Sequence, residues 1–181
     1  MHLSAAPPII DVEASGFGPA SYPIEIGLVL PDGSSYCSLL RPEPDWTHWD
    51  ASAEKVHGLT RETLLKHGRP AQEVARELNE RLHGQTIFCD AWYHDFNWLG
   101  RLYGAVEMHQ AFRLEDIRTV LNEAEANVWH ATKLGVIEDL QLTRHRASND
   151  ARVLQATLLR VKGMAPMAGA LSPECVQNAL R

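Results

Sequence analysis

The sequence contains little cysteine, and its three cysteines form no recognisable framework. Cys37, Cys89 and Cys175 are odd in number, lie far apart and include no Cys-x-x-Cys pair. This spacing argues against a disulfide framework or a zinc-thiolate site and predicts a reducing, cytoplasmic location. We therefore expect all three to be small buried hydrophobic residues.

Long hydrophobic runs are lacking too. No apolar run approaches the roughly 20 residues that a membrane-spanning helix needs. The first ten residues, MHLSAAPPII, lack the basic start and the long apolar stretch of a signal peptide. We expect no membrane partner and no secretion.

Positive charge is in deficit. Lys and Arg together number 17 and Asp and Glu 23, which gives a formal net charge of −6. Proteins that bind nucleic acid nonspecifically usually carry a basic face, which this composition does not indicate. Two bound divalent cations would offset most of this negative charge, so the deficit alone does not exclude a nucleic-acid substrate.

The composition is typical of one compact domain. The 181 residues are 45% hydrophobic and 22% charged, which suits a globular protein with a substantial core. We predict a single domain over residues 1–165. The C-terminal tail, residues 166–181, is expected to be either docked on this domain or flexible.

Apolar patterns and turn residues predict an α/β sandwich with a mixed sheet. Two strands form a hairpin around a Pro-Asp-Gly turn, and we expect both as antiparallel neighbours of the first strand. The predicted strands cover residues 7–15, 22–30, 34–40, 85–90 and 111–117. The predicted helices are 61–66 capped by Thr60, one from Pro70 to Gly84, 95–103, 117–131 capped by Asp116, and a last one through Lys162 capped by Ser148 or Asn149. Residues 41–58 are predicted to be a loop, and residues 132–144 a loop with room for one helical turn.

Two acidic residues end the first predicted strand. Asp11 and Glu13 are two positions apart, which places both side chains on the same face of a strand. Two carboxylates about 6–7 Å apart repel each other unless a cation lies between them. Hard divalent cations such as Mg²⁺ or Mn²⁺ prefer such oxygen ligands.

Two further acids stand near the starts of predicted helices. Asp95 follows the buried strand 85–90, and Asp150 lies in the first turn of the last helix. Taken singly, each position is typical of helix capping. Together with Asp11 and Glu13, however, they give four carboxylates that could meet at one end of the sheet and bind two divalent cations.

Four short motifs resemble those of a known enzyme family. DVEASG, VHGLT, HDFNWL and HRASNDA occur in this order and are similar to the motifs of the DEDDh 3′→5′ exonucleases. That family includes proofreading subunits of DNA polymerases, RNase T and oligoribonuclease, and belongs to the RNase H-like superfamily. The resemblance runs from about residue 9 to residue 162. It implies an RNase H-like fold with a five-stranded mixed sheet flanked by helices.

The resemblance also implies an active site. It makes Asp11, Glu13, Asp95 and Asp150 the ligands of two divalent cations, Mg²⁺ or Mn²⁺, and His145 the general base. Paired cations neutralise a phosphodiester and activate water, while an imidazole can accept the proton of that water near neutral pH. The implied activity is hydrolysis of single-stranded DNA or RNA from its 3′ end to 5′-mononucleotides. Because some relatives are dimers, a homodimer is a further expectation.

Candidate substrate-binding residues follow from the same motifs. The family uses the stretch corresponding to Ala14, Ser15 and Gly16 for the terminal nucleotide, and the loop of His57 lies nearby. A Ser-Gly turn and a loop-anchoring histidine are the structural alternatives. Of the aromatic residues around Asp95, we select Trp92 for base stacking, although such residues more often belong to the core.

Several residues next to the candidate catalytic residues in sequence are not assigned to the active site. Trp98 is expected to pack, and His94 is rejected as a metal ligand because its side chain diverges from that of Asp95. Many family members have His-Asn where this chain has Asp90-Ala91, so Asp90 either supports the ligands or merely ends a strand. Arg144 and Arg146 bracket His145 and are expected in a solvated loop, with phosphate contact as the alternative.

Two other functions remain open on the sequence. The chain could act mainly in a complex with a polymerase or another partner, or it could be an RNase H-like endonuclease. The position of His145 and the order of the motifs favour the exonuclease. DNA and RNA are not distinguished, because no residue clearly reads a 2′-hydroxyl group.

Overall fold

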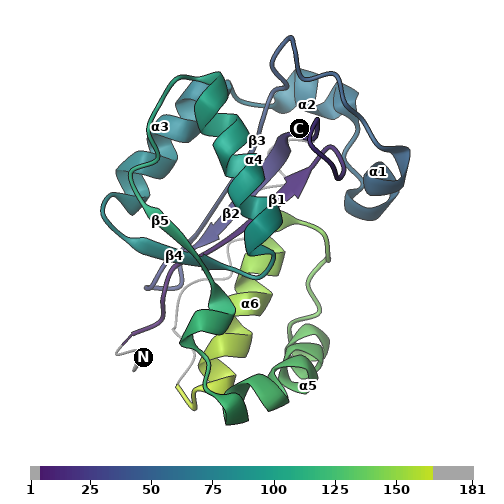
Figure 1. Cartoon of the computed structure of the whole chain (residues 1–181). Coiled ribbons are helices and arrows are strands. Elements are labelled where there is room, and N and C mark those ends of the chain that lie inside the picture. The colour runs from purple at the N-terminus through teal and green to yellow at the C-terminus, as the bar shows by residue number, and fades with distance from the viewer. Residues whose placement is uncertain (1–4, 165–181) are drawn as a thin grey trace.

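The computed structural model describes residues 5–164 and contains one five-stranded sheet with helices on both faces (Figure 1). The strand order is β3-β2-β1-β4-β5. The strands are β1 (Ile9–Ala14), β2 (Pro23–Val29), β3 (Ser35–Leu39), β4 (Thr86–Cys89) and β5 (Arg113–Asp116). The predicted five-stranded mixed sheet is therefore confirmed.

The sheet is antiparallel on one side and parallel on the other. β1 pairs with β2 and β2 with β3 in antiparallel register, whereas β1–β4 and β4–β5 are parallel. The predicted hairpin is correct. The expectation that both of its strands flank β1 is wrong for β3, which forms the sheet edge, because the other side of β1 pairs with β4.

Seven helical segments connect and cover the strands in the described part of the chain. They are α1 (Ala51–His57), α2 (Arg61–His67), α3 (Ala71–Leu82), α4 (Trp92–Ala105), the 3₁₀ helix η1 (Ile117–Val120), α5 (Glu123–Leu140) and α6 (Ala147–Val161). α3 and α4 lie over one face of the sheet and α6 over the other, with α5 outside α6 (Figure 1).

The alternation of side chains along β1 builds two cores. Ile10 and Val12 pack with α3 and α4, whereas Ile9 packs with Leu154 and Leu158 of α6. This follows from the two-residue period of a strand. The face that carries Ile9 also carries Asp11 and Glu13, so these acids point toward the α6 side of the sheet.

Several predicted boundaries are wrong, and α4 starts three residues before the predicted position 95. The stretch 41–58 is not all loop, since Asp50 accepts a hydrogen bond from Ser52 N and starts α1. Asp116 caps only η1, and α5 begins after a capping box formed by Asn122 and Glu125, so it fills most of the predicted loop 132–144. Neither Ser148 nor Asn149 caps α6, because both lie inside it.

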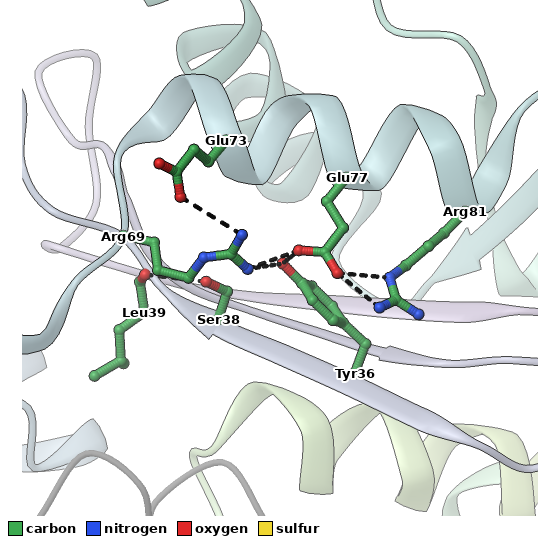
Figure 2. Close-up of polar contacts among 7 residues, drawn as sticks. All are labelled: Tyr36, Ser38, Leu39, Arg69, Glu73, Glu77 and Arg81. Carbon is green, nitrogen blue, oxygen red and sulfur yellow. Dashed lines mark hydrogen bonds and ion pairs between the residues drawn. The ribbon is translucent and has the colours of Figure 1, made fainter.

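A polar network fastens α3 to the edge strand β3 (Figure 2). The Glu77 carboxylate accepts hydrogen bonds from Arg69 and Arg81 at 2.6 Å each, and from Tyr36 at 3.2 Å. The Arg69 amide also donates to Leu39 O. The bond to Leu39 O occupies a backbone carbonyl at the sheet edge that could otherwise pair with another strand.

The cysteine prediction is correct in part. Cys89 is a buried free thiol, as expected. Cys37 is half-buried and disulfide-bonded, so the expectation that it is a buried hydrophobic residue outside any disulfide is wrong. Cys175 lies outside the described residues. The predicted tail 166–181 also lies outside them. Between residues 5 and 164, no helix combines the length and apolarity needed to cross a membrane.

Candidate metal centre

Strand β1 presents two carboxylates on the face that α6 covers. Asp11 and Glu13 are both half-buried, and Val12 between them is buried in the opposite core. Glu13 stands directly across from Glu25 of β2 in the antiparallel register, and the pairing becomes irregular just after Glu13. The predicted common face of the acidic pair is therefore present.

Asp95 reaches the same region from the first turn of α4. Its side chain is 2% exposed, and no described residue hydrogen-bonds to its buried Oδ2 atom. A buried carboxylate oxygen without a partner is unfavourable unless a ligand satisfies it. Burial first, and then the charges of Asp90 and Glu13, raise the pKa of Asp95 to about 7 against the lowering effect of a Cys89 hydrogen bond.

Asp150 is held in the first turn of α6. Its Oδ1 accepts a hydrogen bond from Arg144 Nε at 2.5 Å, and its Oδ2 accepts one from the backbone N of His145 at 2.9 Å. One ligand atom from each of Glu13, His145 and Asp150 lies within 4.8 Å of the others. The structure thus brings Glu13, from the first strand, together with His145 and Asp150, from the start of the last helix.

The carboxylates share one electrostatic environment. The pKa of Asp11 is raised well above its usual value by burial and by the charges of Asp95, Glu13, Asp150 and Glu25. Burial, and then the charges of Asp150 and Glu25, raise the pKa of Glu13 to about 7, although Arg146 and Arg144 oppose this. Such a cluster ionises fully near neutral pH only when positive charge enters it.

The donor set fits hard divalent cations. Glu13 of β1, His145, and Asp150 of α6 bring one ligand atom each within 4.8 Å of the others, and the charges of Asp95, Glu13 and Asp150 all act on Asp11. One of these carboxylates, that of Asp95, keeps a buried oxygen without a partner among the described residues. Oxygen-rich sites of this kind suit Mg²⁺ or Mn²⁺. Asp11, Glu13, Asp95 and Asp150 are the residues that could hold these ions.

The arginines around His145 differ from the prediction. Arg144 is half-buried and forms the ion pair with Asp150. Arg146 is 8% exposed and donates to Glu25 across the sheet, so the prediction that it lies in a solvated loop is wrong. Only the pairing with a carboxylate on a distant strand makes this burial possible, and local sequence carries no signal of it.

The predicted nucleotide loop is tightly built. The Ser15 hydroxyl contacts His48 Nδ1 at 3.1 Å and accepts from Tyr22 N at 3.2 Å. Gly16 has φ +139°, and a Cβ atom there would lie 2.6 Å from the Cβ of Asp50. Ala14 is buried at the end of β1. These contacts are those of a structural turn next to the carboxylates.

His57 lies close to the candidate centre. It is 6% exposed, its Nδ1 accepts from Leu59 N at 3.0 Å, and its buried Nε2 has no partner within residues 5–164. Burial lowers the pKa of His57, with Arg146 and His145 acting in the same direction. The loop-anchoring role is therefore present, and the free ring nitrogen leaves a second contact open.

The aromatic residues of α4 divide into packed and exposed ones. Trp98 is buried and donates to Ser21 Oγ at 2.8 Å, as expected for a packing residue. Trp92 donates to Leu114 O on β5 at 3.0 Å and stacks on Phe96, which are packing contacts too. The sequence reasoning missed Phe17, which is 67% exposed and makes an edge contact with His94.

A cavity of about 370 Å³ lies beside these aromatic residues. Gly18 and Ser21 line it from the loop after β1, and Tyr93, His94 and Trp98 line it from α4. His94 directly precedes Asp95 in the first turn of α4, although none of the four carboxylates lines the cavity. Exposed Phe17 next to a small polar loop is the signal that could have identified this surface.

Asp90 is explained by a neighbouring helix. Its carboxylate accepts from Lys133 Nζ of α5 at 2.5 Å, and its backbone oxygen accepts from Arg118. Asp90 therefore links β4 to α5. The negative charge of Asp90 also raises the pKa of Asp95.

Comparison with known proteins places the fold. No protein-family model matches the chain, and no curated protein sequence matches it either. Solved structures match over most of it and share its α/β fold with a mixed sheet, which agrees with the predicted RNase H-like fold. The described sheet order and flanking helices have this arrangement.

Exonuclease I structures are among those that match. Exonuclease I from Methylocaldum szegediense superposes with a TM-score of 0.63 at 14% identity, over 84% of this chain and 40% of that one. E. coli exonuclease I bound to a dA16 oligonucleotide gives 0.62 at 11% identity, over 86% and 42%. The zinc-bound E. coli enzyme with single-stranded DNA gives 0.63 at 12%, over the same shares. This chain thus spans about two fifths of their length, and the likeness establishes the fold.

Proposed function

We propose that this chain is a metal-dependent 3′→5′ exonuclease that hydrolyses single-stranded DNA or RNA ends to 5′-mononucleotides. One observation carries the proposal: Glu13 of β1 meets His145 and Asp150 within 4.8 Å, in the electrostatic environment of Asp11 and Asp95. Carboxylates and one exposed imidazole in this arrangement suit phosphodiester hydrolysis.

The metal ligands in this proposal are Asp11, Glu13, Asp95 and Asp150. When bound, two divalent cations supply the positive charge that stabilises the attacked phosphate and the leaving 3′-oxygen. The raised pKa values of Glu13 and Asp95 and the unpartnered Asp95 oxygen support this assignment, because both describe a site that lacks compensating charge.

His145 is the proposed general base. It is exposed on the loop before α6, and its own backbone N–H donates to Asp150 Oδ2. This bond fixes the base relative to a metal ligand. The imidazole can then accept a proton from a water molecule aligned on the phosphate.

The terminal nucleotide is assigned to the surface next to the carboxylates. Ala14, Ser15 and Gly16 form one side and His57 another, with Trp92 as the proposed stacking residue. The exonuclease I structures with a dA16 oligonucleotide and with single-stranded DNA and zinc support a single-stranded substrate and a divalent ion. The acidic net charge favours a short contact with a strand end over a long contact with a duplex.

The test uses 5′-labelled single-stranded oligonucleotides of matched DNA and RNA sequence with Mg²⁺ or Mn²⁺. We expect a ladder of products shortened stepwise from the 3′ end and release of 5′-mononucleotides. Asp150→Asn should abolish the ladder, whereas Asp139→Asn, a change in an exposed acid of α5, should leave it intact. Cleavage of a circular strand, or full activity of Asp150→Asn, would contradict the proposal.

A further inference from the structure

A buried ion pair connects the loop of His145 to strand β2. Arg146 Nη2 donates to Glu25 Oε1 at 2.7 Å, and Ala147 N donates to Glu25 Oε2 at 3.1 Å. The Glu25 side chain is fully buried and that of Arg146 is 10% exposed. A single carboxylate therefore holds both the residue before α6 and the first residue of α6.

The same face of β2 allows the start of α6 to approach its backbone closely. Gly27 lies two residues beyond Glu25, and a Cβ atom on Gly27 would lie 2.1 Å from Ala147 C and from Ser148 N. Any larger residue would displace the helix. Glu25 and Gly27 together thus fix where α6 begins.

The residues that these contacts hold in place are bonded to the candidate catalytic residues. His145 precedes Arg146, and the Arg146 carbonyl accepts backbone hydrogen bonds from Asn149 N at 2.8 Å and Asp150 N at 3.0 Å. A shift of Arg146 would therefore move His145 and Asp150 together, relative to Glu13 on the sheet.

Stability alone does not account for the Glu25–Arg146 pair. Replacing a buried ion pair by apolar residues of similar size is often neutral or stabilising, because desolvation offsets the attraction. Glu25 also lies directly opposite Glu13, and its charge contributes to the repulsion in the acidic cluster. An apolar residue there would relieve this repulsion.

We propose that Glu25 and Arg146 are positioning residues, which orient the start of α6 so that His145 and Asp150 face Glu13. The proposal rests on the proposed function for its catalytic consequence. Neither residue touches the substrate; both act through the backbone of residues 145–150.

The test is the double variant Glu25→Gln, Arg146→Met. Removing both charges at similar volume avoids the unpaired buried charge that either single change would leave. We expect a folded protein with a melting temperature near that of the wild type and a KM within about twofold. Its kcat should fall about 10–100-fold, as is typical when residues that orient metal ligands are lost.

The opposite end of α6 offers a matched control. Lys162 Nζ pairs with Glu125 at 2.7 Å, and these side chains are 11% and 17% exposed. The double variant Lys162→Met, Glu125→Gln removes a similarly enclosed pair from the same helix and should leave kcat unchanged. Wild-type kcat in the folded Glu25, Arg146 variant, or an equal fall in the control, would overturn the proposal.

A second readout is independent of activity. Calorimetric titration of Mn²⁺ without substrate should show about 10-fold weaker binding in the Glu25, Arg146 variant, and hydrogen exchange should be faster at the amides of residues 145–150. If the wild type binds Mn²⁺ but degrades no oligonucleotide, the proposed function fails and these measurements still decide the positioning role. Unchanged Mn²⁺ affinity together with unchanged exchange would refute it.

Discussion

The two ends of α6 use charge in opposite ways. At its C-terminal end, Lys162 pairs with Glu125 and Arg160 pairs with Asp139 at 2.8 Å, so opposite charges meet there. At its N-terminal end, the charge of Asp150 helps to raise the pKa values of Asp11 and Glu13. Groups that repel each other in a folded protein oppose stability, and functional sites are where such arrangements occur.

Backbone conformation separates the two ends as well. His145 has φ +59°, a left-handed conformation that costs a non-glycine residue about 1–3 kcal/mol unless its surroundings impose it. The hydrogen bond from His145 N to Asp150 and the Glu25 contacts of the next two residues impose it here. Only the N-terminal end of α6 therefore combines strain, buried charge and an exposed imidazole.

Replacing the imidazole tests this contrast most severely. Asn tolerates the left-handed conformation, so His145→Asn should keep the fold and the melting temperature. Without a general base, kcat on a single-stranded oligonucleotide should fall about 10²–10⁴-fold. Steady-state kinetics with saturating Mn²⁺ measure this. A variant with wild-type kcat would remove His145 from the mechanism.

Removing one ligand charge should separate activity from stability. Asp11→Asn should reduce kcat by about 100-fold or more, because a lost ligand removes several kcal/mol of transition-state stabilisation. In the absence of metal it should raise the melting temperature, since it removes the repulsion from Asp95, Glu13 and Asp150. Calorimetry in EDTA measures the second effect. Glu125→Gln, which breaks an attractive pair, should lower the melting temperature and leave kcat intact.

The strands and the acidic face of β1 were accessible from sequence, because they depend on local patterns. Apolar runs end at turn residues, and Asp11 and Glu13 share a face through the two-residue period of a strand. Thr60 likewise caps α2 as predicted, because its hydroxyl oxygen accepts a hydrogen bond from Thr63 N. Such features need no information from distant parts of the chain.

The start of α6 was not accessible, because its cap is tertiary. A local Ser or Asn cap was predicted at 148 or 149, yet the helix begins at Ala147, and in the described structure no Arg146 side-chain bond caps it. Glu25 takes the Ala147 N–H instead, from a strand 122 positions away in sequence. The extent of α5 was missed for another reason: of its residues only Val136 is buried, so no apolar stripe marks the helix.

The pH dependence of stability should have opposite signs at the two ends. Glu13 has a raised pKa of about 7 in the fold, against 4.5 for an ordinary Glu. Between these values the folded state binds more protons than the unfolded state, so the metal-free protein should lose stability as pH rises from about 4.5 to about 7. Glu125 has a lowered pKa because of Lys162 and Asn122, so its contribution is present above pH 4.5 and is lost as pH falls.

Thermal melts across pH 4.5–7.5 in EDTA measure this dependence. Glu13→Gln should flatten the decline, whereas Glu125→Gln should not. Mn²⁺ at 100 times its dissociation constant should restore about 2.7 kcal/mol at pH 7, which corresponds to roughly 5–10 °C for a domain of this size. If the melting temperature changed neither with pH nor on addition of Mn²⁺, the carboxylates would not form a cation site.

The smallest expected effect is at the exposed pair of the C-terminal end. Arg160 and Asp139 are 50% and 61% exposed, and such surface pairs contribute about 0–1 kcal/mol because water and salt screen them. Arg160→Gln should shift the melting temperature by no more than about 2–4 °C and leave kcat, KM and Mn²⁺ affinity unchanged. This substitution could instead lower Mn²⁺ affinity as much as loss of the Glu25–Arg146 pair does. In that case a change at the C-terminal end of α6 would reach the metal centre, and the contrast between the two ends of the helix would not hold.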